Sequence, residues 1–270
     1  MVMKGSSLQV FSRPLGARRV VAPVIFALAF FIVWEVWLRF LPMSRAVIAP
    51  PSAIYTTIVN AFPILMKHTL STLVEIMIGF MSASAVGIAL GAAITLSTSI
   101  RQAFYPNIVG FQLIPKVAVA PLFVVWLGVG SPSRLAFSVF MAFFPIAVAT
   151  ATGLANTKVD AVRLCRSLTA TNWQTFTSVR LPFAIPFVFA GLKVGLTMAM
   201  IGIIVGEFIT GQEGLGYVIM FASSAGESAP LYAALVILAT MGLGLYSCLL
   251  LVEVAVQRWY GVPFSSEGFA

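Results

Sequence analysis

The chain has 270 residues, of which 60% are hydrophobic and only 9% are charged. Together with a mean hydropathy of +1.03, this composition excludes a soluble globular domain, in which roughly 25% of residues are charged. The net charge of +8 does not indicate nucleic-acid binding, because the basic residues are dispersed among apolar runs rather than gathered on one face. The sequence therefore predicts an all-α membrane protein.

Six apolar segments follow one another along the chain, and each is long enough to span a membrane. They lie at roughly residues 20–41, 69–97, 102–127, 133–155, 183–210 and 230–256. The first begins after Arg18 and Arg19 and is too long for the core of a signal peptide, so we expect it to be retained. Pro115 and Pro121 interrupt the third segment, and Pro145 should kink the fourth.

Two shorter segments are expected at the outer surface. Residues 52–66 suggest a short helix with Ser52 as its N-cap. Residues 211–228 form a Gly- and Ser-rich loop with a short apolar stretch, Leu215–Phe221, that includes Tyr217. This stretch is either an external gating or docking helix or a short helix lying flat at the membrane interface.

The distribution of basic residues predicts the orientation, because cytoplasmic loops carry an excess of Lys and Arg. Six spans put both termini on one side. That side would carry Lys4, Arg13, Arg18, Arg19, Arg101, Lys158, Arg163, Arg166, Arg180 and Arg258, and the other side only Arg39, Arg45, Lys67 and Arg134. We therefore expect a six-helix domain at 18–260, with tails 1–17 and 261–270 and the loop 157–182 in the cytoplasm.

The loop at residues 157–182 is the longest polar interruption of the apolar sequence. Four of its residues recur at i, i+3, i+4 and i+7, on one face of a helix: Ala161, Leu164, Cys165 and Leu168. Thr171 and Gln174 match a capping box, which predicts a second short helix carrying Trp173 and Phe176. The apolar stripe of this helix–turn–helix either contacts another protein or rests on its own bundle or on lipid headgroups.

Two lysines fall inside predicted spans, Lys116 in the third and Lys193 in the fifth. A lysine at the bilayer centre costs ~3 kcal/mol on insertion scales, so each should face the bundle interior, a partner or water. Lys116 either lines a solute path, where it would favour anions, or pairs with a carboxylate, or snorkels to the boundary. Lys193 lies nearer the cytoplasmic end of its span and is expected to snorkel. Because Pro115 and Pro121 break the backbone ladder beside Lys116, that part of the third span should border a cavity.

No catalytic or metal site is predicted. The chain has no Gly-x-x-x-x-Gly-Lys-[Ser/Thr] phosphate loop, so it cannot itself supply ATP hydrolysis. His68 is its only histidine, and we find neither a His/Cys metal cluster nor a nucleophile–base pair. A membrane enzyme is therefore disfavoured.

Three stretches resemble one subfamily of bacterial ABC importer permeases, which serves sulfonates, taurine, nitrate and related small solutes. Residues 114–130, IPKVAVAPLFVVWLGVG, resemble the signature of its third span. The sequence RSLTA at 166–170, followed by Trp173, Phe176, Leu181 and Pro182, resembles its cytoplasmic EAA loop. Residues 206–208, GEF, and 211–217, GQEGLGY, resemble the end of its fifth span. The resemblance extends over roughly residues 45–258.

The resemblance implies a type I importer permease in a bacterial inner membrane. It would act as a homodimer with two cytoplasmic ATPase subunits, which use ATP and Mg²⁺, and with an external solute-binding protein. The expected ATPase-coupling residues are Arg163, Leu164, Cys165, Arg166, Ser167, Leu168, Thr169, Ala170 and Trp173. The expected solute-path residues are Pro115, Lys116, Glu207 and Tyr217. No cofactor is expected in this chain.

The loop departs from the family motif at two points. Aligned without gaps, the Glu-Ala-Ala of the motif falls on Arg163, Leu164 and Cys165, and its glycine falls on Thr169. The first change reverses a charge, and the second removes the freest backbone position of the turn. Either the ATPase cleft is matched to this permease, or the loop couples weakly.

The alternative of a different class is a secondary transporter driven by an ion gradient, with Glu75, Lys116 and Glu207 as coupling sites. Against it, the chain shows no inverted repeat of three spans, which is frequent in such folds. The sequence does not name the solute. A sulfonate, nitrate, taurine, an aromatic acid and a vitamin precursor remain open, and Lys116 favours a small anion.

Overall fold

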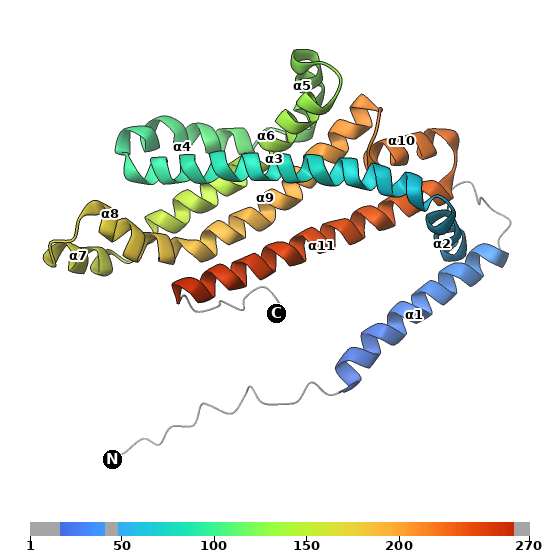
Figure 1. The fold of residues 1–270 in the computed structure, drawn as a ribbon, viewed down its shortest axis with the longest axis horizontal. Helices are drawn as coiled ribbons and strands as arrows, with labels where there is room; N and C mark the ends of the chain where they lie inside the picture. Colours follow the sequence, from blue (N-terminus) through green and yellow to red (C-terminus); the bar gives the residue numbers. More distant parts are fainter. Residues whose placement is uncertain (1–16, 41–47, 262–270) are drawn as a thin grey trace.

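The computed structural model describes residues 17–40 and 48–261, and all the regular secondary structure in these ranges is helical (Figure 1). The α-helices are α1 (Ala17–Phe40), α2 (Pro51–Asn60), α3 (Phe62–Leu96), α4 (Thr98–Gln112), α5 (Ala120–Leu127), α6 (Ser131–Ala155), α7 (Val159–Ser167), α8 (Asn172–Thr175), α9 (Leu181–Thr210), α10 (Leu215–Ala225) and α11 (Ser228–Tyr260). A 3₁₀ turn at Lys116–Val119 precedes α5, and a π turn at Phe176–Arg180 joins α8 to α9. The predicted tails lie outside the described residues except for Ala17 and Gly261.

Four helical segments in the described part of the chain are long and apolar enough to cross a membrane: Phe62–Thr95, Ser131–Ala155, Asn172–Thr210 and Ser228–Tyr260. They confirm the second, fourth, fifth and sixth predicted spans. The first predicted span corresponds to α1, whose described apolar stretch, Ile25–Leu38, is shorter. In Figure 1, α1 approaches the bundle at its end near α2, where Trp34 also contacts Tyr232 of α11 with ring centroids 6.2 Å apart.

The third predicted span, at 102–127, is interrupted near Pro115 as expected, and the segment forms two helices. The helix α4 ends at Gln112, and α5 starts only at Ala120. Pro115 has no N–H to donate and disfavours helical geometry at the residue before it. Pro121 instead lies in the first turn of α5, where its missing N–H costs nothing. In Figure 1, α4 runs beside α3, whereas α5 points away from it.

The predicted N-cap at Ser52 is wrong. The N-cap of α2 is Pro50, and the helix has no capping hydrogen bond from the side chain of its N-cap residue. Glu35 of α1 takes that role, since its carboxylate accepts hydrogen bonds from the Ser52 backbone N–H at 3.0 Å and from Ser52 Oγ at 2.8 Å. The predicted helix at 52–66 is in fact α2 and the first turn of α3, which breaks off from α2 at Ala61.

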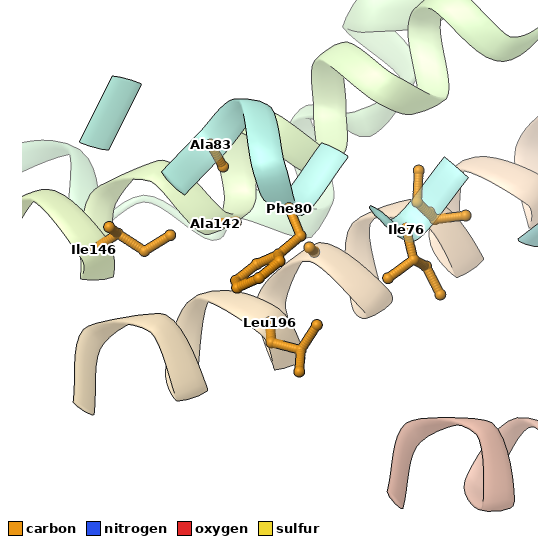
Figure 2. Close-up of a cluster of buried hydrophobic side chains, with 8 residues drawn as sticks. Ile76, Phe80, Ala83, Ala142, Ile146 and Leu196 are labelled. Atoms are coloured by element: carbon orange, nitrogen blue, oxygen red, sulfur yellow. The ribbon is translucent and has the colours of Figure 1, made fainter. Parts of the chain in front are cut away.

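The core forms where α6 packs between α3 and α9 (Figure 1). Figure 2 shows the buried side chains that meet there: Ile76, Phe80 and Ala83 from α3, Ala142 and Ile146 from α6, and Leu196 from α9. Glycines let the backbones approach, because a Cβ on Gly202 would lie 2.7 Å from Ser138 Cα, and one on Gly91 would lie 2.6 Å from Thr150 Cβ. The small residues at four-residue spacing therefore serve helix packing.

Candidate functional site

The carboxylate of Glu207 lies at the N-terminal end of α10. Its Oε2 accepts a hydrogen bond from the Gly216 backbone N–H at 2.6 Å, and its Oε1 accepts one from Thr72 Oγ1 at 2.7 Å. Thr72 Oγ1 accepts in turn from the Leu215 N–H at 2.8 Å. The first N–H groups of a helix have no partner within the helix, and the helix dipole favours a negative charge there. Glu207 and Thr72, which are 1% and 0% exposed, therefore cap α10 from two other helices.

Two glycines make room for this carboxylate. A Cβ on Gly214 would clash with the carboxylate of Glu207, and one on Gly216 would lie 2.8 Å from Glu207 Cβ and 2.9 Å from the Ile204 carbonyl oxygen. Gly214 also has a φ of 102°, a backbone conformation that favours glycine. The close turn between α9 and α10 therefore requires the glycines within the stretch 211–217.

A buried ion pair next to this cap joins α3 to the start of α6. Arg134 Nε donates to Glu75 Oε2 at 2.8 Å, and Arg134 Nη2 lies 2.5 Å from Glu75 Oε1, with 2% and 8% of the two side chains exposed. Arg134 Nη1 donates to Thr210 Oγ1 at 3.3 Å, and Nη2 lies 3.6 Å from Glu213 Oε1. A guanidinium can hold a carboxylate through two parallel bonds, so this one arginine joins α3, α6, α9 and the turn before α10.

Tyr217 belongs to the same assembly. It is half-buried, and its ring lies 5.9 Å from that of His68 on α3. His68 Nδ1 accepts a hydrogen bond from the Gly214 N–H at 3.1 Å. The structure thus brings two of the predicted path residues, Glu207 and Tyr217, to one end of the bundle, where they fasten α10 to α3.

The other two predicted path residues, Pro115 and Lys116, lie elsewhere. Lys116 Nζ lies 4.9 Å from the ring centroid of Phe144 on α6, which is a cation–π contact. Phe144 is ten residues beyond Arg134 along α6, which is roughly 15 Å. Pro115 is exposed, and Lys116 is half-buried. Among the described residues no carboxylate pairs with Lys116, so of the three alternatives for this lysine the ion pair is not found, and its contact is the aromatic ring.

Lys193 does not snorkel as expected. Its Nζ lies 2.7 Å from Glu253 Oε2, and the side chains are 25% and 7% exposed. Gln257 Nε2 donates to the other oxygen of Glu253 at 3.3 Å. The ion pair holds α9 to α11 and removes an unpaired charge from the apolar interface.

The loop at 157–182 forms the predicted helix–turn–helix, α7 and α8, at the end of the bundle opposite α10 (Figure 1). The capping box is confirmed, because Gln174 N–H donates to Thr171 Oγ1 at 3.2 Å and Thr171 N–H donates to Gln174 Oε1 at 2.8 Å. Thr169, on which the glycine of the motif falls, has a φ of 59°. The turn therefore keeps the left-handed conformation that glycine adopts without strain.

The apolar stripe of α7 is only partly covered by the bundle. Leu164 and Leu168 are 61% and 70% exposed, whereas Ala161 and Cys165 are half-buried. Trp173 is 72% exposed and stacks on Phe176 with ring centroids 5.9 Å apart. The remaining predicted coupling residues in the same loop are Arg163, Arg166, Ser167 and Ala170, of which Ala170 is half-buried and the others are exposed.

Sequence reasoning assigned no role to Arg134 or Thr72, although they complete the site around Glu207. A signal was present for Arg134. Glu75 and Arg134 carry opposite charges near the same end of two predicted spans, which is where buried charges are expected to pair. Thr72 carries no such signal, because its partners Glu207 and Leu215 lie more than a hundred residues away.

Comparison with known proteins identifies the family of the chain. Residues 83–259 match the family model described as binding-protein-dependent transport system inner membrane component. A probable ABC transporter permease protein of Haemophilus influenzae is 30% identical, over 84% of this chain and 93% of its own length. The formylaminopyrimidine transport permease protein ThiX of Halalkalibacterium halodurans is also 30% identical, over 88% of this chain and 95% of its own length. Relatives at 26–27% identity are named as taurine, aliphatic sulfonate and nitrate permeases.

A solved structure of the MetNI methionine ABC transporter, described as inward facing, shares this fold. The match has a TM-score of 0.61 at 17% identity and covers 74% of this chain and 98% of the other. The family match covers more than half of the chain and contains α6 to α10, which carry most of the α10 cap and the whole helix–turn–helix. The chain therefore belongs to the family of binding-protein-dependent transport system inner membrane components and is the membrane permease subunit of an ABC importer.

Proposed function

We propose that the loop at 157–182 couples this permease to a cytoplasmic ATPase subunit. The observation that carries the proposal is the exposure of Leu164, Leu168 and Trp173 on a helix–turn–helix that protrudes from the bundle. Large apolar side chains gathered in one exposed patch indicate an interaction site. The helices around them are held in place by the capping box and by the continuation of α8 into α9, so the patch is presented on a fixed support.

The assembly we propose follows the description of the family. The permease works as a pair in a bacterial inner membrane, with both termini and the loop in the cytoplasm. Two ATPase subunits, which use ATP and Mg²⁺, bind the two loops, and an external binding protein delivers the solute on the side of α10. The carboxylates that an ion-gradient mechanism would need, Glu75 and Glu207, are instead engaged in buried contacts between helices.

The solute we propose is a small anion, such as a sulfonate, taurine or nitrate. The relatives named for these solutes support it, and so does Lys116, a cation half-buried where the third predicted span breaks. A second candidate is a formylaminopyrimidine-type heterocycle, because the permease named for that solute matches over 88% of this chain. The two candidates are separated by measuring uptake of small anions and of formylaminopyrimidines by the assembled transporter. The parent and Lys116→Ala are compared for each solute. Unchanged uptake kinetics in the variant for every anion would remove the argument from Lys116.

The coupling proposal is tested by purifying the subunit from its native membrane and identifying the ATPase that remains bound. We expect Leu164→Asp with Leu168→Asp to abolish the stoichiometric ATPase, because both leucines would lie in the contact. Trp173→Ala should weaken the association by about 2 kcal/mol, or roughly 30-fold, as for an aromatic anchor at an interface.

Trp126→Ala is the matched control, since Trp126 is 65% exposed on α5, away from the loop (Figure 1). It should leave the bound ATPase unchanged. If the ATPase is retained equally by the parent, Trp173→Ala and the double aspartate variant, the loop is not the coupling surface.

A further inference from the structure

A cavity of about 650 Å³ lies between the helix–turn–helix and the end of the bundle from which it protrudes. Its walls come from the last turns of α3 and α6, the start of α4, one face of α7 and the end of the π turn. Four arginines from three separate parts of the chain line it: Arg101, Arg163, Arg166 and Arg180.

These four positive charges are almost unopposed. No Asp or Glu lines the cavity. Between Glu75 and Glu207 the sequence contains a single acidic residue, Asp160, and its Oδ1 lies 3.9 Å from Arg163 Nη1 at a site where both side chains are largely exposed. An exposed pair of that length contributes little. In the described residues Arg101, Arg166 and Arg180 have no carboxylate within ion-pair distance. The cluster therefore repels itself unless an anion enters from outside the chain.

The guanidinium groups identify the kind of anion. A guanidinium offers its N–H donors in a planar fork that matches the oxygens of a phosphate, and several such forks around one cavity give a phosphate-binding geometry. The remaining walls are mixed: Thr95, Thr152, Asn156 and Thr157 are polar, and the apolar residues are Ile94, Ala151, Leu154, Ala155, Val159 and Val162. Arginines that share a cavity with apolar side chains fit an amphiphile that carries a phosphate at one end.

The position of the cavity favours a lipid as the source. It lies where α3 and α6, two membrane-spanning helices, end. Basic pockets between spans on the cytoplasmic side of a membrane bind anionic lipid headgroups. We propose that this arginine cavity holds the phosphate headgroup of an anionic phospholipid and thereby fixes α7 against the ends of α3 and α6.

The lipid site includes Arg163 and Arg166, two of the expected coupling residues, but not the exposed apolar patch of Leu164, Leu168 and Trp173. Val159, Val162, Arg163 and Arg166 line the cavity, and Leu164 and Leu168 do not, although Val159 and the two arginines are exposed like the leucines. A bound headgroup would therefore set the position of α7 without covering the leucines. The lipid proposal rests on the cytoplasmic orientation given in the proposed function, but it does not rest on the ATPase contact. The lipid site and the ATPase contact can therefore each fail without the other.

The test uses the full chain, purified in detergent, and measures binding of phosphatidylglycerol by native mass spectrometry and by the rise of the thermal unfolding midpoint. Phosphatidylcholine and inorganic phosphate are the comparison probes. We expect phosphatidylglycerol to bind and to raise the midpoint, and phosphatidylcholine to do neither. Arg101→Gln with Arg180→Gln should weaken the binding by at least about tenfold, since two of four guanidinium contacts are lost and neither residue is on α7.

The matched control is Lys158→Gln, which removes an exposed positive charge from the same loop but outside the cavity. It should bind phosphatidylglycerol as the parent does. Arg101→Lys with Arg180→Lys should fall between the parent and the glutamine variant, because the charge remains but the planar fork is lost. If inorganic phosphate binds as well as the lipid and is lost in the same glutamine variant, the anion site stands but the lipid source is overturned. Equal lipid binding by the parent and the glutamine variant would overturn the site itself.

Discussion

Replacing Thr72 by Val should release α10 from α3. Valine keeps the branched shape of threonine but has no hydroxyl, so it can neither donate to Glu207 nor accept from the Leu215 N–H. Thr72 and Glu207 are 0% and 1% exposed, so water does not replace the lost hydroxyl. The substitution therefore isolates one hydroxyl group that joins α3 and α9 to α10.

The expected size of the effect follows from the groups left behind. Leaving a buried donor or acceptor without a partner costs about 1–3 kcal/mol. The Leu215 N–H loses its hydroxyl partner, whereas Glu207 keeps the Gly216 N–H at 2.6 Å. We therefore expect the free energy of opening of α10 to fall by about 2 kcal/mol, which raises the open population roughly 30-fold.

Amide hydrogen exchange measures that opening directly. Peptides that contain Leu215 and Gly216 should exchange roughly 30-fold faster in Thr72→Val than in the parent when exchange follows local opening. Thr69→Val is the matched control, because Thr69 Oγ1 donates only to the Leu65 carbonyl within α3, at 2.7 Å. Unchanged exchange at α10 in Thr72→Val, or the same increase in Thr69→Val, would refute the capping role of Thr72.

Three further substitutions test the buried charges and the loop. Arg134→Met should lower the free energy of unfolding by about 3–5 kcal/mol, because it leaves Glu75 buried without its partner. Adding Glu75→Met should recover most of that loss. A double variant that is no more stable than the single one in thermal unfolding would contradict this. Lys193→Met should cost less, about 2 kcal/mol, since 25% of the lysine side chain is exposed; an unchanged unfolding midpoint would argue against the ion pair to α11. Thr169→Gly should stabilise the loop by about 1 kcal/mol, because glycine adopts a φ of 59° without the strain that threonine carries there. Amide hydrogen exchange at α7 should therefore slow in Thr169→Gly but not in Thr169→Ala. Equal exchange in the two variants would remove the strain argument.

The long spans and the capping box were predictable because their signals are local. Hydropathy over a window of about 20 residues reports whether a segment can cross a membrane. Thr171 and Gln174 are three residues apart, so their reciprocal bonds are encoded within one turn. The break of the third span near Pro115 was predictable for the same reason, because a proline removes a backbone donor and interrupts a helix locally.

The contacts that form the candidate site were not predictable in this way. The resemblance singled out Glu207, but its partner Thr72 is 135 residues away in the chain, and Glu75 and Arg134 are 59 apart. No periodicity within one helix encodes a contact between two helices. The predicted snorkelling of Lys193 failed likewise, because the position of Glu253 beside it depends on how α11 packs against α9.

The helix α8, the π turn and α9 form one continuous helical segment, which can transmit a movement from the loop to the other end of the bundle. The helical segment Asn172–Thr210 has 39 residues, which at the rise of an α-helix is roughly 58 Å. Trp173 lies near one end of this segment and Glu207 near the other; Pro186 lies inside α9, and glycines beyond it pack the helix against α6. A tilt of about 10° about the middle of this segment would move each end by roughly 5 Å in opposite directions. A push applied to the loop would therefore travel along one helical segment and reach α10 through the Glu207 side chain that caps it.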